Sequence, residues 1–226
     1  MAEEPNREKF VAVKTTLPVY PFPPAAERAV ITTERLILRP LVASDIEAYH
    51  DLRRQPEVMH FTSQGRIDVD IAETQAKLDV YLPPKDCLSY NWSIRLKETD
   101  ELIGVGGSHI FYAAWGWPEL GYMLRVEHWG KGFATEFVKA FLEEWKKLPR
   151  VETEIRVDER TASPNADGSV PEHLIAVTEI SNSRSQNILR KCGFEYFITW
   201  DAADSRSVDT LIQLPTFRFF PAKTPE

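Results

Sequence analysis

The segment of residues 118–145 limits the possible folds most strongly, because it predicts a strand, a turn and a helix in direct succession. Between Leu120 and Val126 a hydrophobic residue stands at every second position, which is the period of a half-buried strand. The expected helix is amphipathic, and four hydrophobic residues spaced i, i+3, i+4 and i+7 mark the side that should lie against a sheet: Val138, Phe141, Leu142 and Trp145.

The turn between this strand and helix has the composition of an anion-binding site. Gly130 and Gly132 flank Lys131 directly before the helical pattern begins. Glycines let a ligand approach the main chain, and the first N–H groups of a helix have no internal acceptor and favour an anion such as a diphosphate. A bare G-x-G is more often a plain tight turn, so the glycines alone leave both interpretations open.

Composition excludes several classes of protein. The chain has 43% hydrophobic and 27% charged residues, as expected for a soluble globular protein. A formal net charge of -7 argues against a nucleic acid or an anionic membrane as partner. No hydrophobic run approaches the roughly 18 residues of a membrane-spanning helix, and the charged N-terminus lacks an apolar signal core. We therefore expect a cytoplasmic protein.

Cysteine and histidine usage predicts neither a disulfide framework nor a metal site. The two cysteines are Cys87 and Cys192, which fits a reducing compartment. The five histidines are scattered and show no metal-ligand spacing such as H-E-x-x-H. We predict no metal.

The length of 226 residues fits one domain with extensions. Residues 1–29 are rich in proline and hydrophobic residues, which predicts an extended strap across the body. Residues 30–220 form the domain, and residues 221–226 form a tail. Within the domain, residues 150–172 combine a charged run with a turn-rich stretch, so we expect a surface insertion with a short strand at 154–157.

The other elements follow from local patterns. We expect strands at 36–41, 90–96, 102–111, 174–178, 196–200 and 208–219. A capping box from Ser44 to Glu47 predicts a helix to residue 54, and further helices are expected at 70–82 and 182–193. Residues 58–69 fit a surface loop or a substrate mouth.

Four pieces of this sequence occur in a characteristic order: T-E-R-L-I-L-R-P at 33–40, E-L-G-Y-M-L at 119–124, W-G-K-G-F-A-T-E at 129–136, and N-x-x-S at 182–185 with K-C-G-F at 191–194. Together they resemble the GNAT superfamily of N-acetyltransferases, particularly its ribosomal-protein and N-terminal alanine acetyltransferase branch. The resemblance spans about residues 30 to 220. It implies an α+β fold with a mixed, mostly antiparallel sheet of six to seven strands, splayed at its middle and flanked by about four helices.

The resemblance also implies acetyl-CoA as cofactor. The family's motif is Gln or Arg, two residues, Gly, one residue, then Gly or Ala; Gly130 and Gly132 match it, with Glu127 at the first position. Backbone groups of the central strand are expected to pair with the pantetheine amides. Asn182 and Ser185 either cap their helix or bind the cofactor, and the resemblance favours the cofactor. The expected cofactor-binding residues are Met123, Leu124, Val126, Gly130, Lys131, Gly132, Phe133, Ala134, Thr135, Asn182 and Ser185.

Transfer of an acetyl group to an amine requires a base that removes a proton from the ammonium. Glu119 is the candidate base, with Asn182 as the second residue assigned to catalysis, and His109 on the preceding strand is the alternative base. Many relatives use a tyrosine of the last helix as general acid, but Leu189 stands at that position. We therefore assign no acid.

The acceptor is less defined than the cofactor. Trp115, Trp117 and Phe61 are candidates for an apolar entrance. The expected acceptor is a small-molecule amine or a peptide N-terminus, with no nucleic-acid or membrane partner, and the protein is expected to be a monomer or homodimer. The competing hypothesis is a catalytically silent CoA-binding module that acts through a protein partner. A nucleotide hydrolase is disfavoured because G-K-G lacks the rest of a Walker loop.

Overall fold

The computed structural model describes residues 2–207 and 209–221. The strands are β1 Phe10–Pro18, β2 Ile31–Thr32, β3 Leu36–Arg39, β4 Tyr90–Leu96, β5 Leu102–Ile110, β6 Glu119–Leu124, β7 Arg150–Asp158, β8 Leu174–Val177, β9 Glu195–Ala203 and β10 Leu211–Phe219. The α-helices are α1 Ile46–Arg53, α2 Pro56–Met59, α3 Ile71–Leu78, α4 Phe133–Lys147 and α5 Ser183–Lys191. The predicted tail lies, beyond residue 221, outside the described residues.

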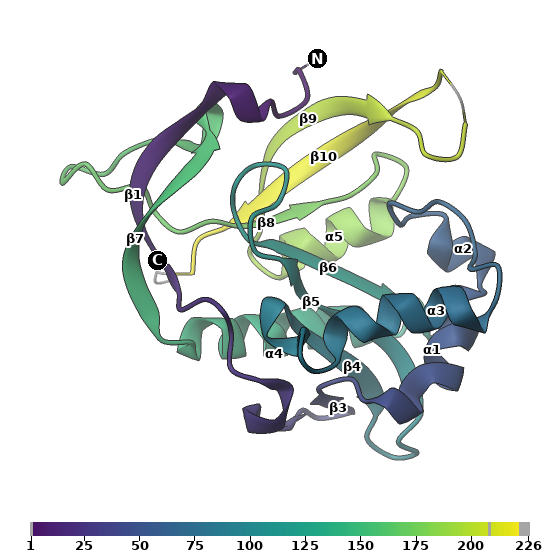
Figure 1. The fold of residues 1–226 in the computed structure, drawn as a ribbon. Coiled ribbons are helices and arrows are strands. Elements are labelled where there is room, and N and C mark those ends of the chain that lie inside the picture. Colours follow the sequence, from purple (N-terminus) through teal and green to yellow (C-terminus); the bar gives the residue numbers. More distant parts are fainter. Residues whose placement is uncertain (1, 208, 222–226) are drawn as a thin grey trace.

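The main sheet has eight strands in the order β2-β3-β4-β5-β6-β8-β10-β9 (Figure 1). Adjacent strands of this sheet are antiparallel, except that β6 and β8 are parallel. These two strands are joined by a single residue pair, Glu119 with Ile175. Beyond this pair the two strands separate, which confirms the α+β class and the predicted splay. The sheet has more strands than the expected six to seven because β2 is only two residues long and leaves no periodic pattern in the sequence.

Helices cover both faces of the main sheet. The helix α4 buries Val138, Phe141, Leu142 and Trp145 against the sheet, as its spacing predicts. The other face carries a smaller core in which Leu52 of α1 and Leu78 of α3 pack against Val105 of β5. The strand β6 contributes Leu124 to the first core and Met123 to the second.

The structure corrects the prediction for residues 150–172. This segment begins with the nine-residue strand β7, which pairs along its full length with β1 of the N-terminal extension. The short strand expected at 154–157 is thus longer, and the extension supplies its partner. Local patterns missed this pairing because about 140 residues separate the strands. Trp117 and Trp145 donate hydrogen bonds to Thr161 and Glu172, which tie the rest of the segment to the core.

Two local predictions on the helical face are also corrected. Asp45, not Ser44, caps the first turn: its carboxylate accepts from the Val42 N–H at 3.0 Å and pairs with Arg39. The turn therefore begins as a 3-10 helix at residues 43–45, before α1. Within the segment that was expected to be a loop at 58–69, the start is helical, because α2 runs from Pro56 to Met59.

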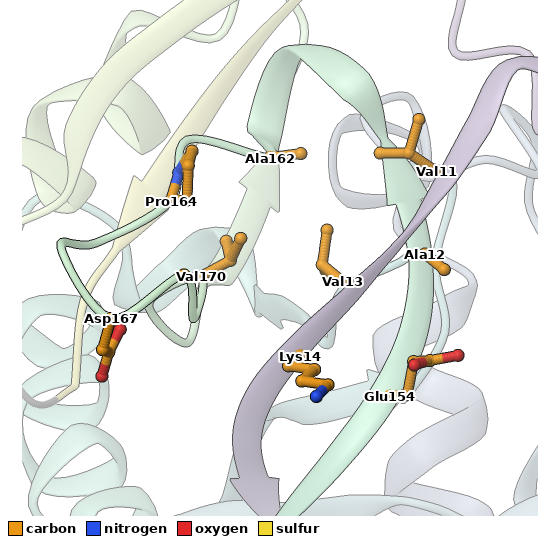
Figure 2. Close-up of a pocket in the computed structure, with 10 residues that line it drawn as sticks. Val11, Ala12, Val13, Lys14, Glu154, Ala162, Pro164, Asp167 and Val170 are labelled. Atoms are coloured by element: carbon orange, nitrogen blue, oxygen red, sulfur yellow. The ribbon is translucent and has the colours of Figure 1, made fainter.

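A hollow of about 530 Å³ lies between β1, β7 and the loop at 162–170 (Figure 2). Lys14 and Glu154 face each other across the two strands at one side of the hollow, and Asp167 and Val170 line the other. None of the predicted cofactor-binding or catalytic residues lines this hollow. The candidate active site therefore lies elsewhere, at the splay where β6 and β8 separate.

Candidate active site

Glu119 occupies the point at which β6 and β8 separate. It forms the only residue pair between these strands, and the Ile175 N–H donates to the Pro118 carbonyl at 2.9 Å. The Glu119 side chain is 18% exposed, and burial raises its pKa from 4.5 to about 7. A carboxyl group with a pKa near neutrality can accept a proton and release it again at physiological pH.

His109 lies beside Glu119, with Nε2 3.8 Å from Oε1 of the carboxylate. Burial lowers the pKa of this imidazole, so the ring is neutral near pH 7. The two candidate bases of the sequence are therefore brought together. The structure places both on the sheet face that also carries Gly121 and Met123.

The register of β6 decides which of its backbone groups face the splay. The Arg125 N–H donates to the Ile103 carbonyl of β5, so the alternate residue Met123 pairs with Val105 in the same way. Met123 consequently has no backbone group left for a ligand, contrary to the expectation. The N–H and C=O groups of Tyr122 and Leu124 point instead toward the splay, and Tyr122 is a position that the sequence prediction missed.

Side chains contact two of the backbone groups that were expected to bind pantetheine. The Trp129 indole donates to the Leu124 carbonyl at 2.8 Å. The Val126 N–H donates to the Gln55 side-chain oxygen at 2.8 Å. The Leu124 N–H has no such contact among the described residues, so it is the group at this end of β6 that a ligand can use directly.

The glycine turn after β6 leaves main-chain donors exposed. Gly130 and Gly132 have φ angles of 72° and 84°, the left-handed region that favours glycine. A side chain at Gly130 would meet nothing within 4 Å. The helix α4 starts at Phe133, and its first hydrogen bond joins the Glu136 N–H to the Gly132 carbonyl. The N–H groups of residues 133–135 therefore come before the first N–H that has an acceptor within the helix, and they are available to an anion.

Arg35 and Thr33 hold this turn in place. Arg35 donates to the Lys131 carbonyl at 3.0 Å and pairs with Glu136 at 2.7 Å. The Thr33 hydroxyl donates to the same carboxylate at 2.6 Å. Two pieces of the sequence pattern that lie about 100 residues apart thus form one structural unit, which explains why they occur together.

The structure favours a different alignment of the cofactor motif. The Glu127 carboxylate accepts two hydrogen bonds of 3.0 Å from the Gln55 amide and is engaged there. Gly132 and Ala134 fill the last two places of the motif when it is aligned two residues later, with Trp129 in the first place, where the family has Gln or Arg. Because the free N–H groups belong to residues 133–135, this later alignment agrees with the geometry.

The helix α5 faces β6 across the splay. The Asn182 side chain accepts from the Ser185 N–H at 3.1 Å, so it caps the helix, which was the alternative role considered for it. The Ser185 hydroxyl lies 2.9 Å from the Tyr122 hydroxyl. Leu189 is buried in the main core, so it presents no polar group where relatives carry a tyrosine.

The predicted apolar entrance is not formed by tryptophans. Trp115 and Trp117 are fully buried, and Trp117 stacks on His173. Large aromatic rings bury most of their surface in a core of this size, and a connecting loop can carry them there. Phe61 is exposed and shares a small apolar hollow with Pro56 and Trp129.

The described residues form neither a metal-ligand cluster nor a membrane-spanning helix. Among residues 2–207 and 209–221, no three His, Cys, Asp or Glu side chains are grouped as metal ligands would be. In the same part of the chain, every helix is too short or too polar to cross a bilayer. Cys192 is buried, and burial raises the pKa of its thiol to about 11.

Comparison with known sequences gives a family. Residues 35–195 match the family model described as acetyltransferase (GNAT) domain. The chain is 34% identical over 114 residues to a Bacillus licheniformis protein named uncharacterized N-acetyltransferase p20, which covers 49% of this chain and 62% of that protein. The chain therefore spans about three-fifths of the length of the curated relatives it matches.

Solved structures share the fold. An acetyltransferase (GNAT family) from Bacillus anthracis superposes with a TM-score of 0.65 at 17% identity, over 86% of this chain and 100% of that one. A spermidine N-acetyltransferase from Vibrio cholerae, solved in complex with CoA and spermine, has a TM-score of 0.61 at 14% identity, over 84% and 98% of the chains. Because the family model matches residues 35–195, which is more than half of the chain, the chain belongs to the GNAT acetyltransferase family.

Proposed function

We propose that the protein is an acetyl-CoA-dependent N-acetyltransferase that transfers the acetyl group to a primary amine by direct attack in a ternary complex. The observation that carries this proposal is the position of Glu119. A mostly buried carboxyl group with a pKa near 7 stands where two parallel strands separate, on the same strand that leads to the glycine turn. The base is thus at the start of β6, and the proposed diphosphate site at residues 130–135 follows the end of this strand.

The residues present fit acetyl-CoA. The turn offers the N–H groups of Phe133, Ala134 and Thr135 and the positive end of α4 to a diphosphate. Gly130 leaves open space beside the turn, and Gly132 sets the chain direction into the helix. Lys131 adds a positive charge at the same place. When bound, the thioester supplies the activated acetyl group.

The splay would hold the pantetheine arm. The Leu124 N–H faces it from β6, while Ser185 and the unused donors of the Asn182 amide face it from α5. Val126 would contribute only if Gln55 releases its N–H. Glu119 would orient the amine and remove its proton. The acceptor is a small-molecule amine or a peptide N-terminus, and a polyamine is bound by one structural neighbour.

The alternative function, a silent CoA-binding module with a protein partner, is favoured by one observation. Leu189 is buried at the position where many relatives carry the tyrosine that acts as general acid. We also propose a cytoplasmic location, because Cys87 and Cys192 are both free thiols.

Calorimetry with acetyl-CoA, followed by a thiol-release assay with a panel of amines and peptides, separates these functions. The enzyme should give binding heat and acceptor-dependent thiol release. Binding heat without thiol release for any acceptor would favour the silent module. A titration without heat would contradict both.

A further inference from the structure

His109 lies at a bulge in β5. Ser108 pairs with Leu120 and Ile110 pairs with Glu119, so His109 is an extra residue between two consecutive pairs. Regular pairing beyond Ser108 and Leu120 would set His109 directly opposite Glu119, so strand alternation already places both side chains on the same face of the sheet. The bulge adds freedom in how the imidazole is aimed, and bulges are common beside active sites.

Gly121 provides the room for the imidazole. A Cβ atom at residue 121 would lie 2.8 Å from Cε1 and 2.9 Å from Nδ1 of His109, which is closer than van der Waals contact allows. The backbone of Gly121 does not adopt a positive φ angle, so the turn geometry does not require a glycine here. Space for the ring is therefore the reason that the structure gives for this glycine.

The two ring nitrogens of His109 differ in their surroundings. Nδ1 is buried and has no close hydrogen-bond partner among the described residues. Backbone groups of Glu119 and Gly107 raise the pKa of the ring against the larger effect of burial. Nε2 faces Glu119, the one acidic side chain of the described residues within ion-pair range of this ring.

Proton balance gives this arrangement a task. When an ammonium acceptor becomes an amide, its nitrogen loses two protons; the C–S bond breaks, and the sulfur takes one of them. The second proton must reach solvent, yet Glu119 is buried and must be deprotonated again before the next turnover. The His109 side chain is 32% exposed, against 18% for Glu119, so water reaches the imidazole more readily than the carboxylate.

We propose that His109 is a positioning residue that accepts the proton from Glu119 at Nε2 through one bridging water, since the two atoms lie 3.8 Å apart, and releases it to solvent from the same nitrogen, since Nδ1 is buried. The step leaves Glu119 as a carboxylate, makes His109 an imidazolium, and returns the ring to neutral when water takes the proton. This role rests on the proposed function, because it assigns the second proton of the same reaction.

Nuclear magnetic resonance tests the pair without turnover. The ¹⁵N shifts of the His109 ring would be followed against pH in the wild type and in Glu119→Gln, with His109→Gln for assignment. Near pH 8 the ring is neutral, and its ¹⁵N shifts show which nitrogen carries the proton. Acceptance through Nε2 requires the neutral ring of the wild type to carry its proton on Nδ1. A neutral ring with its proton on Nε2 would overturn the proposal, whether or not the wild type is active.

Kinetics test the relay itself. At pH 7, His109→Gln should lower kcat about tenfold or more with the KM for acetyl-CoA unchanged within about twofold. The defect should shrink near pH 9, where hydroxide can take the proton. Gly121→Ala, which displaces the ring but keeps it, should show the same pattern, and His50→Gln on α1 is the matched control.

A defect that is equal at both pH values, or none at pH 7, would overturn the proposal. A wild type without thiol release would instead contradict the proposed function, and the resonance arm would still decide the pair.

Discussion

The two ends of β6 offer different kinds of chemistry. At its start, Glu119 and its neighbour His109 on β5 present partly buried side chains whose pKa values are shifted by desolvation. Beyond its end, the turn at Gly130 and Gly132 presents main-chain N–H groups beside open space. The first end depends on side-chain identity and the second on backbone conformation. Substitutions should therefore separate catalysis from cofactor binding along a single strand.

The largest expected effect is on turnover at the start of β6. Glu119→Gln keeps the size of the side chain but removes the base, so kcat should fall about 10²- to 10⁴-fold. The dissociation constant for acetyl-CoA should stay within about threefold, because the turn is unchanged. Calorimetry and thiol release measured on the same preparation provide the check. A comparable loss of binding would show that the two ends are not independent.

The same variant should gain stability at neutral pH. The folded chain raises the pKa of Glu119 from 4.5 to about 7, so it binds this proton more tightly than the unfolded chain. That contribution to stability is complete below about pH 4.5 and is lost as the pH rises through 7. Glu119→Gln does not ionise, so above pH 7 its free energy of unfolding should exceed that of the wild type by up to about 3 kcal/mol.

Urea unfolding of both proteins at about pH 4 and pH 8 measures this difference. Other titrating groups, such as Asp68 with its pKa lowered to about 2, act equally in both proteins and cancel. Equal stabilities at the higher pH would mean that Glu119 is not held in a desolvated place.

The sequence was informative where the chemistry is local. The Gly130 and Gly132 turn, the start of α4 and its buried face all follow from residues within one stretch, and the structure agrees. The pairing of β6 with β5 decides which sheet face carries the Glu119 side chain. It also decides whether the backbone groups of Met123 or those of Leu124 are free to bind a ligand. No local pattern predicts this register, or the bulge at His109 that interrupts it beyond the pair of Ser108 and Leu120.

Long-range pairing also explains the errors elsewhere. The charged run in β7 looks like a loop because its partner β1 lies about 140 residues away. Trp115 and Trp117 were placed at an entrance because their loop position is visible in the sequence and their burial is not. The family resemblance supplied the splay, which local patterns do not encode.

A pair of glycine substitutions sharpens the cofactor end. Gly132→Ala and Gly130→Ala both force a side chain into the left-handed region, which costs about 1–2 kcal/mol of stability. Only Gly132 sets the N–H groups of residues 133–135, so Gly132→Ala should weaken acetyl-CoA binding about tenfold and Gly130→Ala about threefold or less. Calorimetry at a temperature where both variants are folded measures this. The reverse order would favour the motif alignment that begins at Glu127.

The smallest expected effect lies between the two ends, where Tyr122 meets Ser185 across the splay. Ser185→Ala removes the 2.9 Å contact between the two hydroxyl groups and leaves a mostly buried phenol without this partner. A net loss of about 1 kcal/mol in the free energy of unfolding is expected, since such hydrogen bonds contribute about this much. Ser183→Ala, an exposed neighbour on α5, is the control and should change stability by less than about 0.5 kcal/mol.

Because the contact joins β6 to α5, Ser185→Ala should weaken acetyl-CoA binding while kcat at saturation stays near that of the wild type. A lower kcat with unchanged binding would place Tyr122 with Glu119, in the catalytic half of the strand.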